Sequence, residues 1–200
     1  MLRLTFLRNG STEGEEKGRY IGSKDEALTA AEREKLRTAV APEETEAVFC
    51  SPMKRCLETA VLLYPSLSAR VIPELKHCDY GAFADMNYQE LQENEVYRKW
   101  MAEGGSGPYP EGESMSDFRK RCLEGLEKVV AEAWEQEWQE VLLVVSEDVL
   151  RVLLAACAFP REPYEAWHVA FGEGYRVRFH ADAFLAGEQE LVVDKKVRLF

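Results

Sequence analysis

The sequence predicts one α/β domain over residues 1–200, with helices on both faces of a mostly parallel central sheet in a three-layer α/β/α arrangement. Three observations support this fold class. Residues 2–7 form an alternating apolar run that is typical of a short strand. Residues 141–145 (VLLVV) are apolar without alternation, as in a parallel strand that is covered on both faces. Two hundred residues also suffice for one such domain with a full core.

The other elements follow from local patterns. Three glycines and five charges over 12–22 favour an exposed, ordered loop. A helix is expected from Thr29 to about Val40, with Thr29 as its N-cap and Glu32 completing a capping box. The remaining elements are expected in this order: a strand over 46–50, a helix after Ser51-Pro52, a strand over 69–72, helical segments over 87–102, a flexible loop over 104–112, a helix over 116–137, the central strand over 141–145, a helix over 149–158, and two edge strands over 174–180 and 190–198.

Composition limits the partners and the compartment. The formal net charge of -11 argues against nucleic acid, because neutralising phosphates requires clustered Lys and Arg. No stretch approaches the roughly 18 apolar residues of a membrane span, and the first apolar run is too short for a signal peptide. The five cysteines are scattered without a CxxC pair, which suits a reducing compartment. We therefore expect a cytoplasmic protein that contacts neither membrane nor nucleic acid.

A candidate ligand site follows the first strand directly, in the run from Arg8 through Asn9 and Gly10 to Thr12. A strand that ends in Arg, a small polar residue and Gly holds a guanidinium and several backbone N–H groups at the carboxyl edge of the sheet. Ligands bind at this edge in open α/β sheets. The sequence therefore predicts an anion-type site at the end of the first strand.

These residues resemble the histidine phosphatase superfamily, also called the phosphoglycerate mutase-like family. Its opening motif is Arg-His-Gly-Glu-Thr, where this chain has Arg-Asn-Gly-Ser-Thr at 8–12. The loop over 12–22 is similar to that of α-ribazole phosphatase-type members, and residues 51–60 match the family pattern Ser-Pro-x-x-Arg-x-x-x-Thr-Ala. The resemblance implies a phosphoglycerate mutase-like fold, phosphate binding by Arg8 and Arg55, and no cofactor.

The same resemblance places the catalytic residues of the family on substituted positions. The phosphate-accepting histidine falls on Asn9, the second catalytic histidine on Ser146, and the proton-donating glutamate on His77. An asparagine amide has no basic nitrogen lone pair and cannot act as the nucleophile. Serine cannot replace a cationic imidazole. Three catalytic positions have therefore changed.

New acids accompany these changes. Glu15 stands where similar members carry a phosphate-holding asparagine, and Glu147 and Asp148 stand where the family has two glycines. A carboxylate about 6 Å from a phosphate repels each of its charges by roughly 3 kcal/mol at an effective dielectric near 20. Alternatively, the acids pair with the two arginines and leave a self-neutralised pocket. Glu147 and Asp148 also suit the first turn of a helix that has Ser146 as its N-cap.

Three functional hypotheses remain open. The first is a pseudoenzyme that retains an anion-type pocket at Arg8 and Arg55 and binds a small phosphorylated ligand, another small molecule or a protein. The second is an active phosphomonoesterase or phosphomutase that uses His77 as a relocated nucleophile, since histidine titrates near neutral pH. The third is a scaffold or binding protein whose acidic mouth takes a cationic or metal-bound ligand.

The histidines also have a structural interpretation. A lone loop histidine such as His77 is commonly structural, and we interpret His168 and His180, which match no motif, in the same way. His77 and Cys78 together with Cys50 lack the paired ligand spacing of a metal site, so no metal is expected.

Overall fold

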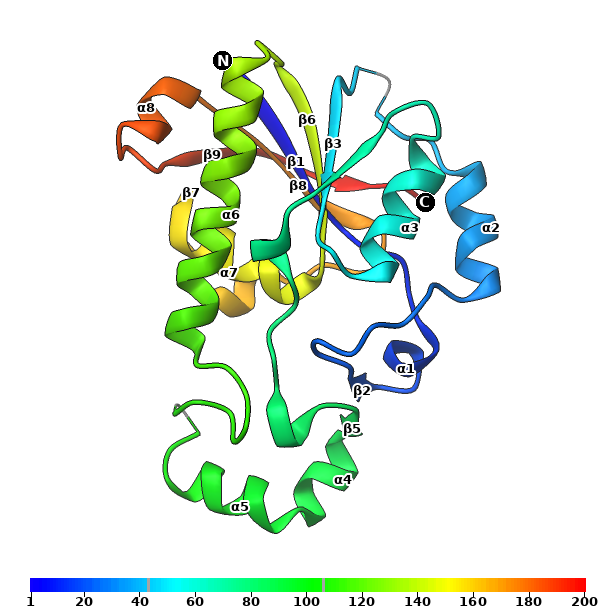
Figure 1. Ribbon diagram of the computed structural model, residues 1–200, viewed down its shortest axis with the longest axis vertical. Helices are drawn as coiled ribbons and strands as arrows, with labels where there is room; N and C mark the ends of the chain where they lie inside the picture. Colours follow the sequence, from blue (N-terminus) through cyan, green and yellow to red (C-terminus); the bar gives the residue numbers. More distant parts are fainter. Residues whose placement is uncertain (43, 106) are drawn as a thin grey trace.

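The computed structural model describes residues 1–42, 44–105 and 107–200 and is built around a seven-stranded sheet of order β4-β3-β6-β1-β8-β9-β7 (Figure 1). Strands β4, β3, β6 and β1 run parallel, β8 is antiparallel to both of its neighbours, and β7 is parallel to β9. The mostly parallel sheet is therefore confirmed. The strands of this sheet are β1 (Leu2–Arg8), β3 (Ala47–Cys50), β4 (Ala69–Val71), β6 (Glu140–Val145), β7 (Ala158–Phe159), β8 (Glu173–Phe179) and β9 (Leu191–Arg198).

Helices cover both faces of the sheet and produce the expected three layers, with α6 and α7 on one face and α2 and α3 on the other (Figure 1). Alternate residues of β6 enter the two cores: Leu143 and Val145 pack in the cluster under α6 and α7, while Leu142 and Val144 pack in the cluster under α2 and α3. The α-helices are α1 (Glu13–Glu16), α2 (Ala30–Thr38), α3 (Lys54–Leu63), α4 (Tyr88–Glu93), α5 (Glu95–Ala102), α6 (Met115–Glu135), α7 (Glu147–Cys157) and α8 (Ala181–Leu185). Short 3₁₀ helices span Pro73–Leu75, Gly81–Phe83 and Tyr164–Trp167.

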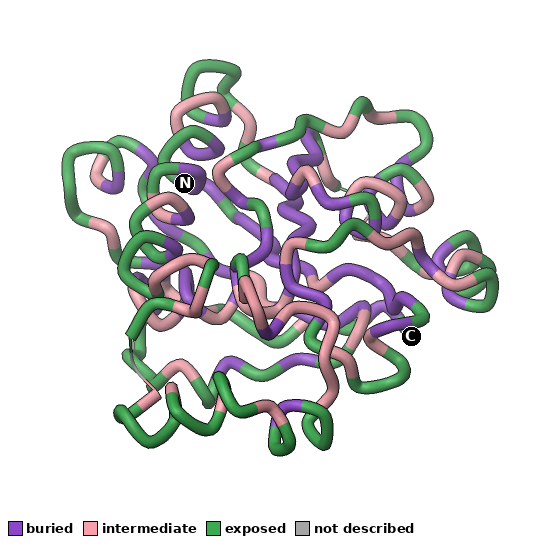
Figure 2. Tube along the Cα trace, turned by 60° about the horizontal axis from the view of Figure 1, so that its bottom comes forward, coloured by how far each residue is buried: buried purple, intermediate pink, exposed green. Residues whose placement is uncertain are grey.

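Strand β6 is buried and lies inside the sheet, as predicted for the apolar run over 141–145. The five residues of β6 from 141 to 145 are all buried, and β6 lies between β3 and β1 as expected for the most apolar strand. Figure 2 shows buried chain through the middle of the molecule and mostly exposed chain at its periphery, including the segment that carries α4 and α5. None of the described helices is long and apolar enough to cross a membrane.

The segment over 12–22, expected to be an exposed, ordered loop, contains regular secondary structure. It contains α1 and the two-residue strand β2 (Arg19–Tyr20), which pairs with β5 (Met86–Asn87) in a second, antiparallel sheet. The short helix forms because Thr12 and Glu15 make a reciprocal capping box. The expected box at α2 is incomplete: Thr29 caps the helix, but the side chain of Glu32 pairs with Lys35 instead of returning to the cap.

The two C-terminal strands are not at the edges of the sheet, so that prediction was wrong. Strand β8 lies between β1 and β9, and β9 pairs on its other side with β7. The approach of β8 to β1 is close, since a Cβ on Gly174 would lie 1.8 Å from the carbonyl oxygen of Phe6. Pairing of this kind depends on distant partners, and an alternating strand pattern does not reveal it. The true edges are β4 and β7.

Helix boundaries differ from the expectation by small amounts. The helical region over 87–102 divides into α4 and α5 at Asn94, which caps the end of the first and the start of the second. Helix α7 begins at Glu147, two residues before the expected start. Position 106, within the expected loop over 104–112, lies outside the described residues.

Candidate functional site

Three neighbouring parallel strands end together and assemble the site. The backbone N–H of Asn9 donates to the Val145 carbonyl over 3.1 Å, and that of Ser51 donates to the Val144 carbonyl over 2.9 Å. The segments that follow β1, β3 and β6 therefore meet at one edge of the sheet, as expected for parallel strands.

All the residues predicted for the site lie at this edge. A pocket of about 330 Å³ is lined by five of them: Arg8, Glu15, His77, Glu147 and Asp148. The other three, Asn9, Arg55 and Ser146, are buried in the adjoining segments. A larger groove of about 860 Å³ lies elsewhere, between the chain start and the end of α6, and contains none of these residues.

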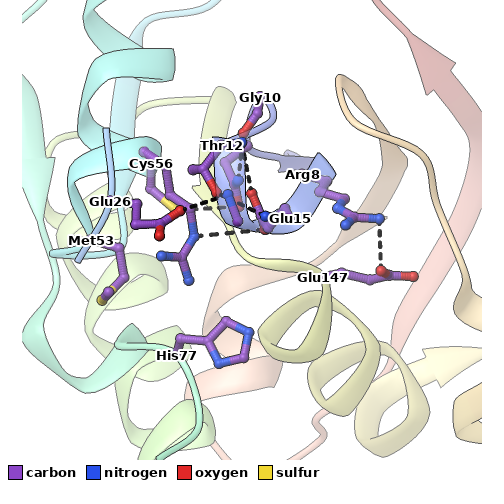
Figure 3. A network of polar contacts seen from close by, with 12 residues as sticks. Arg8, Gly10, Thr12, Glu15, Glu26, Met53, Cys56, His77 and Glu147 are labelled. Atoms are coloured by element: carbon purple, nitrogen blue, oxygen red, sulfur yellow. Dashed lines mark hydrogen bonds and ion pairs between the residues drawn. The ribbon is translucent and has the colours of Figure 1, made fainter. Parts of the chain in front are cut away.

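Arg8 is neutralised by a carboxylate from α7. Its Nη1 lies 2.7 Å from Oε2 of Glu147 and donates to the Val169 carbonyl over 2.7 Å, while its guanidinium lies 3.9 Å from the ring centroid of Phe171. Figure 3 shows the two side chains pointing toward one another. The second oxygen of Glu147 contacts Nδ1 of His168, which is therefore part of this network. The Arg8 and Glu147 side chains are only 14% and 16% exposed, so the pair is largely shielded from water.

Arg55 is fully buried and is held mainly by backbone carbonyls. Its Nη1 donates to Lys24 over 3.2 Å and its Nη2 to Gly22 over 3.1 Å. Its Nε lies 3.9 Å from Oε1 of Glu15 without forming a hydrogen bond. Burial raises the pKa of Glu15, because the opposing attraction of Arg55 and Arg8 is smaller than the cost of desolvating the carboxylate.

Asn9 and Ser146 supply no nucleophile and no cation. The Asn9 amide donates to the Gly10 carbonyl over 2.7 Å, and its Oδ1 lies 3.7 Å from the Cys56 sulfur. Ser146 occupies the N-cap position of α7, but its hydroxyl makes no capping hydrogen bond and finds no partner among the described residues. The expectation of a capping serine was therefore right about the position and wrong about the contact.

His77 faces a carboxylate inside the pocket. Its Nδ1 lies 3.1 Å from the Cys78 carbonyl oxygen, and its Nε2 lies 3.8 Å from Oδ2 of Asp148. Burial lowers the pKa of His77 in spite of Asp148, so the ring is neutral near pH 7. Because a carbonyl oxygen only accepts, the ring proton belongs on Nδ1 and the Nε2 lone pair is left toward the pocket.

Asp148 is held by tyrosines and not by an arginine. It accepts hydrogen bonds from the hydroxyl of Tyr80 and, over 3.1 Å, from that of Tyr164. Burial and the adjacent carboxylate raise the pKa values of both tyrosines, so both remain protonated donors. The pairing alternative therefore describes Glu147, which pairs closely with Arg8. Glu15 lies only within 3.9 Å of Arg55, and Asp148 belongs to a separate tyrosine–histidine cluster.

The sequence analysis did not single out Arg19, Tyr80 and Arg151, which line the pocket. It also missed Tyr164, which contacts Asp148 and Arg151 from behind the lining residues. Arg151 had a usable signal, since it lies four residues after Glu147 and therefore on the same face of a helix. Tyr164 had none, because it reaches Asp148 only through the turn after α7. No three His, Cys, Asp or Glu side chains in the described part of the chain lie close enough to form a metal site.

The sequence matches the model of one protein family over most of its length. Residues 4–187 match the model of the histidine phosphatase superfamily (branch 1). The chain belongs to the histidine phosphatase superfamily. The resemblance drawn from the first loop and the first strand is thereby confirmed at the level of the family.

Named proteins are similar to this chain in sequence or in fold. Phosphoserine phosphatase 1 of Hydrogenobacter thermophilus is 27% identical over 156 residues, which cover 74% of this chain and 72% of that protein. A candidate alpha-ribazole-5′-P phosphatase from Escherichia coli superposes with a TM-score of 0.77 at 25% identity, covering 96% of this chain and 94% of the other. The phosphoglycerate mutase from Thermus thermophilus superposes with a TM-score of 0.68 at 24% identity over the whole of both chains. The phosphoglycerate mutase-like fold is therefore shown.

Proposed function

We propose that this member of the superfamily has lost phosphohistidine chemistry and acts as a binding protein through its altered pocket. The observation that supports this most is the ion pair between Arg8 and Glu147, made by two side chains that are largely shielded from water. Phosphoryl transfer depends on cationic groups that stabilise the charge on the transferred group. Here the Glu147 carboxylate already pairs with Arg8 at the end of β1, where a phosphoryl group would otherwise bind.

The two positions that correspond to catalytic histidines support the same proposal. Asn9 is 0% exposed, and its amide is engaged with Gly10, so it offers no lone pair to phosphorus. Ser146 is neutral and buried and cannot supply the positive charge of an imidazolium. The pocket therefore lacks both a nucleophile and a second cation at the places where the family resemblance would put them.

Charge repulsion disfavours a phosphate in the pocket as it stands. A phosphate at Arg8 would have to displace Glu147 and would then share the pocket with Glu15 and Asp148. Each carboxylate about 6 Å away would repel each phosphate charge by roughly 3 kcal/mol at an effective dielectric near 20. For a doubly charged ligand, this repulsion therefore cancels much of the attraction to the guanidinium groups.

The proposal is tested by steady-state phosphatase assays with p-nitrophenyl phosphate, phosphoserine and 3-phosphoglycerate. We expect phosphate release no faster than in a buffer blank. A turnover number of about 1 s⁻¹ or more, within the ordinary range of enzymes, would overturn the proposal.

Removing the internal carboxylate should reopen the oxyanion site. In Glu147→Gln, Arg8 loses its charged partner, and inorganic phosphate should raise the unfolding temperature of the variant but not that of the wild type. Phosphate at about ten times its dissociation constant would add about 1.4 kcal/mol to the free energy of unfolding. Glu165→Gln, an equal change of charge at an exposed position on the 3₁₀ helix after α7, is the control and should behave like the wild type. Equal phosphate stabilisation of the wild type and Glu147→Gln would show that the ion pair does not close the site.

A second candidate function is phosphomonoester hydrolysis with His77 as nucleophile. It is favoured by a neutral ring that lines the pocket, is anchored at Nδ1 by the Cys78 carbonyl and leaves Nε2 unprotonated. Trapping a labelled phosphoenzyme separates the two candidates. A label that forms in the wild type and disappears in His77→Ala would establish the second function, and the absence of any label would remove it.

We also propose a reducing compartment such as the cytoplasm. All five cysteines are buried and free. Burial raises the pKa of Cys50 to about 11 and that of Cys56 to about 12, so both thiols stay protonated and unreactive. Thiol labelling of the unfolded protein from fresh lysate should find all five reduced.

A further inference from the structure

Among the described residues, one guanidinium that lines the pocket has no carboxylate partner. Arg8 pairs with Glu147, and Arg19 pairs with Asp85 and Glu90. Arg151 lines the same pocket, yet in the part of the chain that the structure describes no carboxylate oxygen lies within 4.0 Å of its guanidinium nitrogens. Its charge is therefore available to a ligand.

The Arg151 side chain is already held in place. Its Nε donates to the Tyr164 carbonyl over 3.1 Å, and its guanidinium carbon lies 4.0 Å from the centroid of the Tyr164 ring. The hydroxyl of the same tyrosine donates to Asp148, which fixes the ring against the pocket wall. A planar guanidinium that is fixed at Nε and stacked on a ring keeps both Nη groups for bidentate contact with an oxyanion.

The neighbouring acids select among oxyanions. Glu15, Glu147 and Asp148 line the same pocket as Arg151, and they repel a dianion about twice as strongly as a monoanion. A carboxylate presents two oxygens to a guanidinium with a single negative charge, whereas a phosphate monoester near neutral pH carries close to two. The electrostatics of this pocket therefore favour a monocarboxylate over a phosphate.

The remaining walls fit an unsaturated or apolar body. Tyr20 and Tyr80 pack edge to face with ring centroids 6.3 Å apart and both line the pocket, together with Ile21. A volume of about 330 Å³ is at the lower end of the range for small-molecule sites. We propose that the pocket binds a small monocarboxylate. Arg151 binds the carboxylate, and Tyr20 and Tyr80 contact the rest of the ligand. This inference rests on the proposed binding function and names the class of ligand.

Isothermal titration of the full chain with benzoate, phenyl phosphate and benzylamine tests the inference, because the three probes share a ring and differ in charge. We expect benzoate to bind most tightly. Arg151→Gln should weaken benzoate by roughly tenfold or more, as for the loss of a charge-assisted hydrogen-bonded pair, and Arg151→Lys should give an intermediate loss because it keeps the charge without the fork. Arg161→Gln, at an exposed arginine just beyond α7, is the matched control and should stay within about twofold of the wild type.

Several results would overturn the inference. These are no benzoate binding up to about 10 mM, equal affinity in Arg151→Gln, or tighter binding of phenyl phosphate or benzylamine than of benzoate. Circular dichroism of each variant shows whether a loss of binding is a loss of fold, and Arg151→Lys remains informative if Arg151→Gln unfolds. Phenyl phosphate turnover in the same samples would count against the proposed function alone and would leave the carboxylate result intact.

Discussion

Glu15 in the pocket and Glu173, the first residue of β8, both lie beside cations but respond to them differently. Glu173 is contacted by Lys196 at 2.8 Å and by Arg198 at 2.7 Å. The contact with Lys196, then the hydrogen bond from the Ala170 backbone N–H and the charge of Arg198, lower its pKa to about 2. Glu15 has Arg55 only at 3.9 Å, and burial raises its pKa. The same pair of charge types therefore stabilises the ionised acid in one region and fails to do so in the other.

The difference lies in what the cations contact. The two cations that contact Glu173 lie on β9, are 44% and 68% exposed, and place their nitrogens directly on the carboxylate. Arg55 is fully buried and directs its Nη groups to the Gly22 and Lys24 carbonyls. The pocket thus retains desolvated charges that do not optimise stability, which is typical of binding and catalytic sites.

The largest expected effect comes from Arg55→Met. The substitution leaves Glu15 buried without its nearest cation and removes the donors to two backbone carbonyls, so we expect a loss of about 3–5 kcal/mol in the free energy of unfolding. Urea denaturation at pH 7 measures it. Arg198→Met is the control at the other region and should cost less than about 1 kcal/mol, because Arg198 is exposed and Lys196 remains on Glu173. Equal losses in the two variants would contradict the comparison.

A smaller effect is expected for Glu173→Gln. Its carboxyl has a folded pKa of about 2, below the ordinary value of 4.5, so the charge stabilises the fold above pH 4.5 and this stabilisation is lost as the pH falls through about 2. Because both cations face solvent, we expect the variant to lose only about 1–2 kcal/mol at pH 7. Denaturation curves at a series of pH values should converge for variant and wild type near pH 2. A constant difference across this range would exclude the electrostatic origin.

The smallest effect, with the opposite sign of pH dependence, is expected for Glu15→Gln. Since the folded pKa of Glu15 lies above its ordinary value, the wild type gains stability as the pH falls from neutral toward 4.5. Glutamine mimics the protonated acid, so the variant should be at least as stable as the wild type at pH 7 and should lose its advantage on acidification. The same denaturation series measures both. A variant that is clearly less stable at pH 7 would show that attraction to Arg55 outweighs burial.

The sequence predicted which residues meet at the pocket better than it predicted which charges pair there. The opening strand, the 51–60 match and the run after β6 were enough to bring Arg8, Arg55 and Ser146 to one sheet edge, because parallel strands end together. The family followed from the same residues and is confirmed by the match over 4–187. What the sequence left open was the partner of each charge. The contact of Glu147 with Arg8, and not of Asp148, depends on the direction in which consecutive side chains leave α7.

The elements that were wrong in the sequence analysis failed for a similar reason. The strand over 174–180 was expected at an edge, yet it lies inside the sheet because β1 and β9 both pair with it. Ser146 has the side chain of a good cap and makes no cap, since its buried hydroxyl points elsewhere. Local patterns report the conformation that a segment favours and contain no information about its neighbours.

The sequence by itself determined the order of the longer helices and strands, the superfamily, and five of the charged residues at the carboxyl edge (Arg8, Glu15, Arg55, Glu147 and Asp148), because periodicity and motif spacing are properties of the chain. Only the tertiary structure decided that Glu147 neutralises Arg8 and that two tyrosines hold Asp148. It also decided that Arg151 stacks on Tyr164 and pairs with none of the described carboxylates. These pairings form between residues brought together by separate strands and turns, over distances where a shift of a few ångströms exchanges one partner for another.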